Sequence, residues 1–220
     1  NIFKILKFLK FMQKKEDIFF ELALKSNSLL LGDFTLKSGK KSPYFFNVGA
    51  FFNQGHIGEL AELYADVIVE SGLEFDLIFG PAYKGIPLAA AISTTLNLRS
   101  SKPFPFAFDR KEAKSHGEGG SIVGELKDKR VLIVDDVLTA GTALKHSIDT
   151  INSEGGKVVG SLVALDREEI LHGALARDII LNDFSIDVMS IARISQLVEF
   201  FYLSDREEEA TTIKNYLTNL

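Results

Sequence analysis

The sequence of 220 residues contains no cysteine and no tryptophan, and it also lacks long apolar runs. Without cysteine the chain can form neither a disulfide nor a thiolate metal site, which fits the reducing cytoplasm where we expect the protein to be. No apolar run approaches the roughly 18 residues that a membrane-spanning helix requires, so no membrane partner is expected. Internal repeats and low-complexity segments are absent too, which leaves the class of ordinary globular proteins.

Positive charge is also scarce. Lys and Arg together number 25 against 30 Asp and Glu, which gives a net charge of -5 and an isoelectric point near 5.5. This balance argues against a surface that holds nucleic acid by its phosphates, so we expect no nucleic-acid partner, whereas small anions can still bind at local cationic clusters. A hydrophobic content of 46% is enough for the core of one α/β domain with a small subdomain.

The first eleven residues, NIFKILKFLKF, differ from the rest of the chain. They are mostly apolar, with Lys4, Lys7 and Lys10 at every third position, a pattern typical of a short basic amphipathic element. These lysines interrupt any signal-peptide core, and a surface anchor is an alternative. We expect Met12 to be the natural start, so that residues 1–11 are a non-native or disordered extension and residues 12–220 form a single domain.

The chain is organised around residues 131–143, which read VLIVDDVLTAGTA. Four apolar, mostly β-branched residues predict a buried parallel strand, and the carboxylates of Asp135 and Asp136 follow at its C-terminal end. The next four residues, TAGT, combine two hydroxyls with a glycine just before a segment with helical spacing. Free N–H groups at a helix start bind anions, and ligands of open α/β sheets lie beyond the carboxyl ends of the strands. This segment therefore predicts a phosphate site.

The acidic pair has two other interpretations. Two acids after a strand more often cap a helix or face water than bind a ligand. An apolar strand that ends in acids also occurs in nucleotide triphosphatases, but those proteins need a G-x-x-x-x-G-K-[ST] loop, and the sequence has none.

Periodicity predicts the remaining elements of an α/β fold. A helix is expected over 14–25, with Ile18, Phe19, Leu22 and Ala23 facing inward. The other expected elements are a hairpin over 29–48, helices over 55–70, 86–97 and 196–220, and strands over 75–79, 104–108, 157–165 and 186–191. Residues 80–85, GPAYKG, form a second glycine-bracketed loop between a strand and a helix.

Residues 109–120, DRKEAKSHGEGG, are too polar and too rich in glycine to pack as core, so they predict a mobile loop. Most such segments are solvated charged connections. This one brings Arg110, Lys111, Lys114 and His116 near the predicted phosphate site. A lid of this kind could neutralise a diphosphate leaving group and shut out water.

The strand, acidic pair and T-x-G-T loop together resemble the motif with which type I phosphoribosyltransferases bind phosphoribosyl diphosphate (PRPP). Four segments, in this order, resemble the orotate phosphoribosyltransferase family: FTLKSGKKSPYFFN (34–47), FDLIFGPAYKGIP (75–87), RKEAKSHGEGG (110–120) and VLIVDDVLTAGTA (131–143). The resemblance runs from about Met12 to Arg167 and continues weakly beyond. It implies a mostly parallel central sheet flanked by helices, with a small N-terminal hairpin subdomain.

The resemblance also implies an activity and a set of roles. The activity is transfer of the phosphoribosyl group from PRPP to N1 of orotate in pyrimidine biosynthesis, with Mg²⁺ held mainly through PRPP. The PRPP-binding and catalytic positions implied are Lys37, Tyr83, Lys84, Asp135 and Asp136, together with the segment Val137, Leu138, Thr139, Ala140, Gly141, Thr142 and Ala143, whose last five residues bind the 5'-phosphate.

For orotate, the resemblance implies that Phe45 and Phe46 line the pocket and that Arg167 pairs with the carboxylate. The alternatives are hairpin core for the two rings and a surface charge for Arg167 and Lys37. The implied lid residues are Arg110, Lys111, Lys114 and His116, and in the family this lid closes over the neighbouring subunit, so a homodimer is expected. His56, His146 and His172 have no partner motif and are expected to be structural or surface residues.

Two alternative functions belong to proteins of the same fold. A purine or uracil phosphoribosyltransferase would need a different base pocket, against which Lys37, Phe45, Phe46 and Arg167 argue. A regulatory protein of the same fold, sensing PRPP and binding nucleic acid, would need a helix-turn-helix extension or a basic face, and the sequence shows neither.

Overall fold

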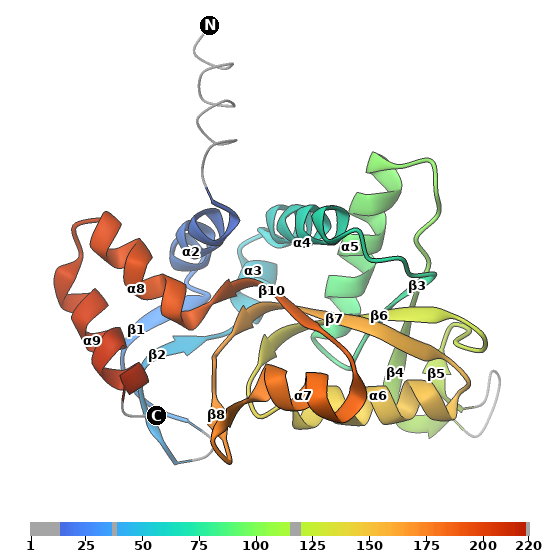
Figure 1. Cartoon of the computed structure of the whole chain (residues 1–220). Coiled ribbons are helices and arrows are strands. Elements are labelled where there is room, and N and C mark those ends of the chain that lie inside the picture. The colour runs from blue at the N-terminus through green and yellow to red at the C-terminus, as the bar shows by residue number, and fades with distance from the viewer. Residues whose placement is uncertain (1–13, 37–38, 115–119, 219–220) are drawn as a thin grey trace, which may run out of the picture. The chain divides into compact units, whose positions relative to one another are not determined.

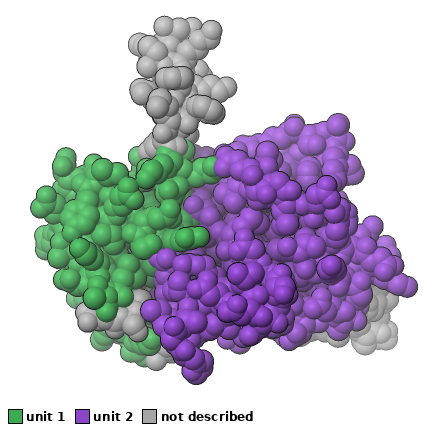
Figure 2. All heavy atoms as spheres, viewed as in Figure 1, with its two compact units in different colours: residues 1–56, 192–220 green, residues 57–191 purple. Residues whose placement is uncertain are grey.

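The computed structural model describes residues 14–36, 39–114 and 120–218, with the backbone only from 111 to 114. The chain divides into two compact units (Figure 2). Unit 1 combines the residues up to His56 with those from Ala192 onward, and unit 2 runs from Ile57 to Ile191. The expectation of one domain over 12–220 stays a prediction, and residues 1–11 lie outside the described part of the chain.

Unit 2 is built on a six-stranded sheet with the order β10-β7-β6-β3-β4-β5 (Figure 1). Strand β3 runs parallel to β4 and β6, and β6 runs parallel to β7, whereas β5 closes one edge antiparallel to β4. The strands are β3 (Leu77–Gly80), β4 (Phe106–Lys114), β5 (Gly120–Val123), β6 (Arg130–Leu138), β7 (Lys157–Asp166) and β10 (Val188–Arg193), the last of which crosses into unit 1.

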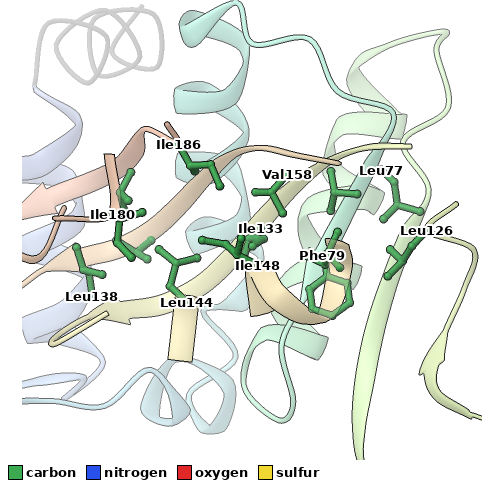
Figure 3. Close-up of a cluster of buried hydrophobic side chains, with 14 of the residues drawn as sticks. Leu77, Phe79, Leu126, Ile133, Leu138, Leu144, Ile148, Val158, Ile180 and Ile186 are labelled. Carbon is green, nitrogen blue, oxygen red and sulfur yellow. The ribbon is translucent and has the colours of Figure 1, made fainter. Parts of the chain in front are cut away.

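Helices cover both faces of this sheet. Helices α4 (Ile57–Ser71) and α5 (Gly85–Arg99) lie on one face, and α6 (Thr142–Ser153) and α7 (Ala176–Phe184) lie on the other (Figure 1). Figure 3 shows Leu144 and Ile148 of α6 packed with Ile133 of β6 and Ile180 of α7. Each such buried side chain contributes about 1.5–3 kcal/mol to folding, which anchors α6 behind the carboxyl end of β6.

The turn from β3 into α5 depends on two glycines. A Cβ on Gly80 would lie 2.1 Å from the carbonyl oxygen of Gly85, and one on Gly85 would lie 2.6 Å from Cδ of Pro81. Any larger residue would therefore push the helix away from the strand. The close contact places the intervening Tyr83 and Lys84 at the carboxyl end of β3.

Unit 1 joins both ends of the described chain in one aromatic core. Phe20 of α2 contacts Phe200 of α8 with ring centroids 5.6 Å apart, and Tyr44 of β2 contacts Tyr216 of α9 at 5.9 Å. The elements of this unit are α2 (Lys15–Lys25), β1 (Leu29–Thr35), β2 (Lys41–Phe46), α3 (Gly49–Asn53), α8 (Ile194–Leu203) and α9 (Glu207–Thr218). None of the helices in the described ranges is long and apolar enough to cross a membrane.

The expected α/β class, the hairpin and the main helices and strands are confirmed. In α2 the inward-facing residues differ from the prediction. Phe20 is buried, because its ring packs on the C-terminal helices, whereas Ile18 is only partly buried. The expected C-terminal helix is wrong as a single element, since it breaks between α8 and α9 at Asp205, which has a φ of 56°. Helices α3 and α7 and the small hairpin of β8 (Ile170–Leu171) and β9 (Ala174–Leu175) were not predicted.

Candidate active site

The acidic pair lies inside β6, not after it, because β6 extends to Leu138 by pairing with β7. Successive side chains of a strand point to opposite faces, so Asp135 and Asp136 face different layers. Asp136 is buried, and its Oδ2 accepts a hydrogen bond from Nζ of Lys84 at 3.0 Å. Lys84 stands immediately before α5, and 51% of its side chain is exposed. The pair therefore joins β6 to the β3–α5 loop and leaves a cation open to a ligand.

Asp135 is held through its backbone and its carboxyl group. Its carbonyl oxygen accepts the Tyr64 hydroxyl at 2.6 Å, and its Oδ1 accepts the backbone N–H of Asp136 at 2.8 Å. Burial, and next the charge of Asp136, raise the pKa of Asp135 to about 7, although the Lys84 charge acts in the opposite direction. Near neutral pH this carboxyl group can accept or donate a hydrogen bond.

Tyr64 of α4 also belongs to this group of contacts, although the sequence did not indicate it as a site residue. Its ring is fully buried, and burial followed by the charges of Asp136 and Asp135 raises its pKa. The phenol therefore stays protonated and keeps donating to the Asp135 carbonyl. Because Tyr64 occurs among apolar residues at helical spacing, the sequence indicated that it packs in the core and did not indicate this hydrogen bond.

The loop after β6 opens directly into α6. Gly141 is the N-cap residue and adopts a φ of 75°, a conformation that favours glycine. The first N–H groups of the 12-residue helix have no intrahelical partner, and the helix dipole favours an anion at this end. Thr142 and Ala143 are exposed, so a ligand can reach this end of the helix. These features fit the predicted phosphate site.

A small cavity of about 30 Å³ lies behind this loop. Asp135, Thr139 and Gly141 line it together with Ser161 of β7. The Ser161 side chain is fully buried, and its Oγ has no hydrogen-bond partner among the described residues. Sequence reasoning missed this residue, because a serine inside an apolar strand carries no signal of what lies behind it.

The β3–α5 loop brings Tyr83 to the same edge as Asp136. Tyr83 is 63% exposed, and the neighbouring Ala82 donates its N–H to Oδ1 of Asp109 at 2.5 Å. Strand β3 ends at Gly80 between β4 and β6, and Lys84 of the following loop bonds Asp136, so the structure brings together Tyr83, Lys84 and the segment from Asp135 to Ala143.

Arg167 follows the next strand, β7. Its backbone N–H donates to the carbonyl of Leu138 at 3.1 Å, which places it beside the end of β6. Its side chain is 13% exposed, and its Nε lies 3.5 Å from Oε1 of Glu169. Arg177, which the sequence did not single out, forms ion pairs with Asp166 and Glu168 on either side of Arg167.

Other predicted site residues lie in unit 1 or outside the described residues. Phe45 and Phe46 belong to unit 1, where the Phe45 ring is 41% exposed and the Phe46 ring packs 5.9 Å from Phe19. Phe46 thus takes part in the hairpin core that was weighed as an alternative. Lys37 lies outside the described residues, and His146 and His172 are exposed.

Part of the predicted lid segment is a strand. Residues from Asp109 to Lys114 were predicted to be loop, but they continue β4, which pairs with β5 at Asp109 opposite Ile122 and, after an irregularity in register, at Lys114 opposite Gly120. Arg110 and the backbones of Lys111 and Lys114 therefore belong to a strand, and His116 lies outside the described residues. Polar side chains favoured a loop, whereas backbone pairing decided for a strand.

Comparison with known proteins shows the family and the fold. A model of the phosphoribosyl transferase domain matches residues 49–177. Orotate phosphoribosyltransferase of Marinobacter nauticus is 48% identical over 205 residues, covering 93% of this chain and 95% of that protein. The chain belongs to the orotate phosphoribosyltransferase family. A crystal structure of the orotate phosphoribosyltransferase from Francisella tularensis superposes with a TM-score of 0.81 at 40% identity, covering 92% of this chain and 98% of that one.

A further likeness reaches beyond bacteria. UMP synthase from Leishmania donovani matches with a TM-score of 0.76 at 28% identity, over 93% of this chain and 42% of that one. The expected type I phosphoribosyltransferase fold and the expected family are thereby confirmed.

An orotate phosphoribosyltransferase is expected to use Mg²⁺. Among the described residues, no group of three or more His, Asp or Glu side chains could hold a metal ion. Mg²⁺ is often bound through one or two carboxylates plus substrate phosphates, so a single carboxylate such as that of Asp136 is compatible with an ion that arrives with PRPP. The residues present therefore fit a substrate-borne ion.

Proposed function

We propose that the chain transfers the 5-phosphoribosyl group from PRPP to N1 of orotate, releasing diphosphate and forming orotidine 5'-phosphate. One observation carries this proposal: Asp135, Asp136, the loop that opens α6, and Lys84 meet at one edge of the sheet in unit 2. Relatives that share 45–48% of their residues with the chain are named for this activity.

The phosphate and the ribose are assigned to β6 and α6. The N–H groups from Thr139 to Ala143 bind the 5'-phosphate, because Gly141 turns the backbone toward the ligand at a helix start. Asp135 and Asp136 bind the ribose hydroxyls. The anionic Asp136 also favours the positive charge that develops on the sugar as its bond to diphosphate stretches.

The diphosphate is assigned to the β3–α5 loop and the lid. Lys84 is half-exposed and already oriented by Asp136, and Tyr83 stands next to it. Mg²⁺ held by the oxygens of PRPP would add positive charge on the departing group. Lys37 is assigned to the same group by the family resemblance.

In the reaction, the bond from C1 of the ribose to the diphosphate oxygen breaks and a bond from C1 to N1 of orotate forms. The electron pair of the broken bond leaves with diphosphate, where Lys84 stabilises it. Orotate has acidic ring nitrogens, so N1 attacks as an anion and no strong protein base is required. Arg167 pairs with the orotate carboxylate through its planar fork, which suits that group better than an ammonium would.

The assignment of Phe45 and Phe46 to the orotate ring rests on the resemblance, as does a homodimer in which the lid serves the partner's site. In that arrangement Arg110, Lys111, Lys114 and His116 surround the diphosphate of the other subunit and exclude water. A cytoplasmic location is proposed with them, since the sequence contains no cysteine.

The test is to supply PRPP, Mg²⁺ and, one at a time, orotate, uracil, adenine and hypoxanthine, and to detect nucleotide products by chromatography. Orotidine 5'-phosphate from orotate alone supports the proposal. A nucleotide formed from a purine or from uracil but not from orotate would contradict it. Omitting PRPP provides the blank.

A further inference from the structure

Arg167 stands in a tight turn that a single arginine holds from both sides. Asp166 and Glu168 are its immediate neighbours, and one nitrogen of Arg177, Nη1, lies 2.6 Å from Oδ2 of Asp166 and 3.4 Å from Oε1 of Glu168. Arg177 belongs to the first turn of α7, ten residues beyond Arg167. The two carboxylates that flank Arg167 are thus tied to one cation.

The backbone of this turn needs such support. Glu168 adopts a φ of 52°, in the left-handed region that residues other than glycine rarely occupy. Its N–H donates to Oδ1 of Asp166 at 2.8 Å, while the other oxygen of that carboxylate accepts from Arg177. Asp166 therefore supports the turn only while its carboxylate is held in this orientation.

The cluster is largely withdrawn from solvent. The side chain of Asp166 is 3% exposed, that of Glu168 is 16% exposed, and that of Arg177 is 18% exposed. Ion pairs withdrawn from water in this way have a fixed geometry, because their partners cannot be replaced by solvent at low cost. Arg177 itself is directed at Asp166 and Glu168, so the described contacts give it a supporting position and not one facing a ligand.

The ends of the turn are tied to the sheet and to α7. The N–H of Arg167 donates to the Leu138 carbonyl, and the N–H of Ala176 donates to the Glu169 carbonyl at 3.0 Å. The turn is thereby joined to the end of β6 on one side and to the start of α7 on the other. Arg177 completes this frame from α7, and the Arg167 side chain itself lies 3.5 Å from Glu169 within the turn.

We propose that Arg177 is a positioning residue for orotate: it fixes the Asp166–Glu168 turn so that the Arg167 guanidinium is oriented for the substrate carboxylate. This inference rests on the proposed function, in which Arg167 binds that carboxylate. Arg177 acts through Arg167 and does not itself contact the substrate. Its loss therefore weakens orotate recognition selectively, since PRPP is assigned to β6, α6 and the β3–α5 loop.

The experiment compares Arg177→Ala, Arg167→Ala and the double variant by steady-state kinetics with orotate and PRPP varied separately. Arg177→Ala is expected to raise KM for orotate roughly tenfold and to leave KM for PRPP within about twofold, as for residues that orient a ligand-binding group. In the Arg167→Ala background the same change should alter KM for orotate by less than about twofold, because the group it orients is gone.

Arg99→Ala is the matched control. Arg99 also bridges two carboxylates, Glu62 and Asp66, but at the C-terminal end of α5, and it should leave both KM values unchanged. Arg177→Lys keeps a cation beside Asp166 and should restore part of the orotate affinity. If Arg177→Ala is not recovered as folded protein, Glu168→Gln takes its place. This substitution weakens the contact between Arg177 and Glu168 and leaves the ion pair with Asp166 intact. A rise in KM for orotate, without a rise in KM for PRPP, is again expected.

The outcomes distinguish a failure of this inference from a failure of the proposed function. If Arg167→Ala raises KM for orotate while the variant at Arg177, or Glu168→Gln in its place, leaves it unchanged, the positioning role is wrong and the proposed function stands. Equal rises in both KM values, or additive effects in the double variant, also overturn the positioning role. If Arg167→Ala does not affect orotate, both the assignment of Arg167 and this inference fail.

Discussion

Two ion pairs at neighbouring strand ends of unit 2 differ in their access to water. Lys84 and Asp136 lie 3.0 Å apart, with 51% of the lysine side chain and 10% of the aspartate side chain exposed. Arg177 and Asp166 lie 2.6 Å apart, with 18% and 3% exposed. The first pair presents a cation to an incoming ligand, whereas the second is closed around the backbone turn beside it.

This difference separates residues that bind from residues that support. A cation that remains half in water keeps its charge available and loses little when its partner is removed. A carboxylate withdrawn from water depends on its partner, because an unpaired buried charge is costly. We therefore expect the open pair to govern activity and the closed pair to govern stability and orotate recognition.

The largest effect on stability is expected at the closed pair. Arg177→Ala leaves the Asp166 carboxylate buried and unpaired, so the free energy of unfolding should fall by about 3 kcal/mol. Lys84→Ala should lower it by less than Arg177→Ala does, because the lysine is half-exposed and the Asp136 side chain keeps 10% of its area exposed, against 3% for Asp166. Urea unfolding of both variants measures the difference, and equal losses would contradict the distinction between the two pairs.

The activity should respond in the opposite order. Lys84→Ala removes a cation from the departing diphosphate and should lower kcat/KM for PRPP roughly 100-fold, equivalent to about 2.7 kcal/mol. Lys145→Ala is a suitable control, since Lys145 pairs with Asp183 at 2.8 Å in the same unit without belonging to the proposed site. A Lys84→Ala enzyme with unchanged PRPP kinetics would remove this residue from the diphosphate site.

A third prediction tests whether the lid works across a dimer. Lys114→Ala and Asp136→Asn are each expected to be inactive, but mixed dimers should contain one intact site. Random reassortment makes half of the dimers mixed, so activity should recover to about a quarter of wild type. Mass spectrometry confirms the exchange. Activity that stays at the sum of the two variants would show that the lid serves its own chain.

The fourth prediction concerns pH. The pKa of Asp135 is raised from its ordinary value of 3.8 to about 7, mainly by burial and by Asp136. The folded state therefore binds this proton more tightly than the unfolded state, and its contribution to stability should fall as pH rises from about 4 to about 7. Asp135→Asn should flatten this slope in urea unfolding without PRPP. A slope identical to wild type would mean that Asp135 titrates normally.

The smallest effect is expected at the cavity behind the phosphate loop. Ser161→Ala removes a buried hydroxyl without a described partner and should raise the free energy of unfolding by up to about 1 kcal/mol. Ser147→Ala is the control, because its hydroxyl donates to the Ala143 carbonyl at 3.1 Å and its removal should not stabilise. Destabilisation by Ser161→Ala would show that the hydroxyl is hydrogen-bonded in solution.

Much of the proposed substrate site could be predicted because its residues are consecutive. The apolar run of β6, the acids at 135 and 136 and the glycine before α6 occur within 13 residues, so strand period, charge and turn chemistry all act on one short segment. The same holds for the glycine-bracketed loop that carries Lys84. The end of β4 was missed for the converse reason, since its polar side chains favoured a loop and only its pairing with β5 made it a strand.

The sequence by itself therefore determined the fold class and the succession of strand, acidic pair and glycine-initiated helix after residue 131, since each depends on local period and on residue chemistry. Only the tertiary structure decided that Tyr64 donates to the Asp135 carbonyl, that Arg177 holds the turn around Arg167, and that both chain ends share the core of unit 1. These contacts join residues from different elements. Their formation depends on how helices pack on the sheet and which charges lose their water, and no short stretch of sequence encodes either.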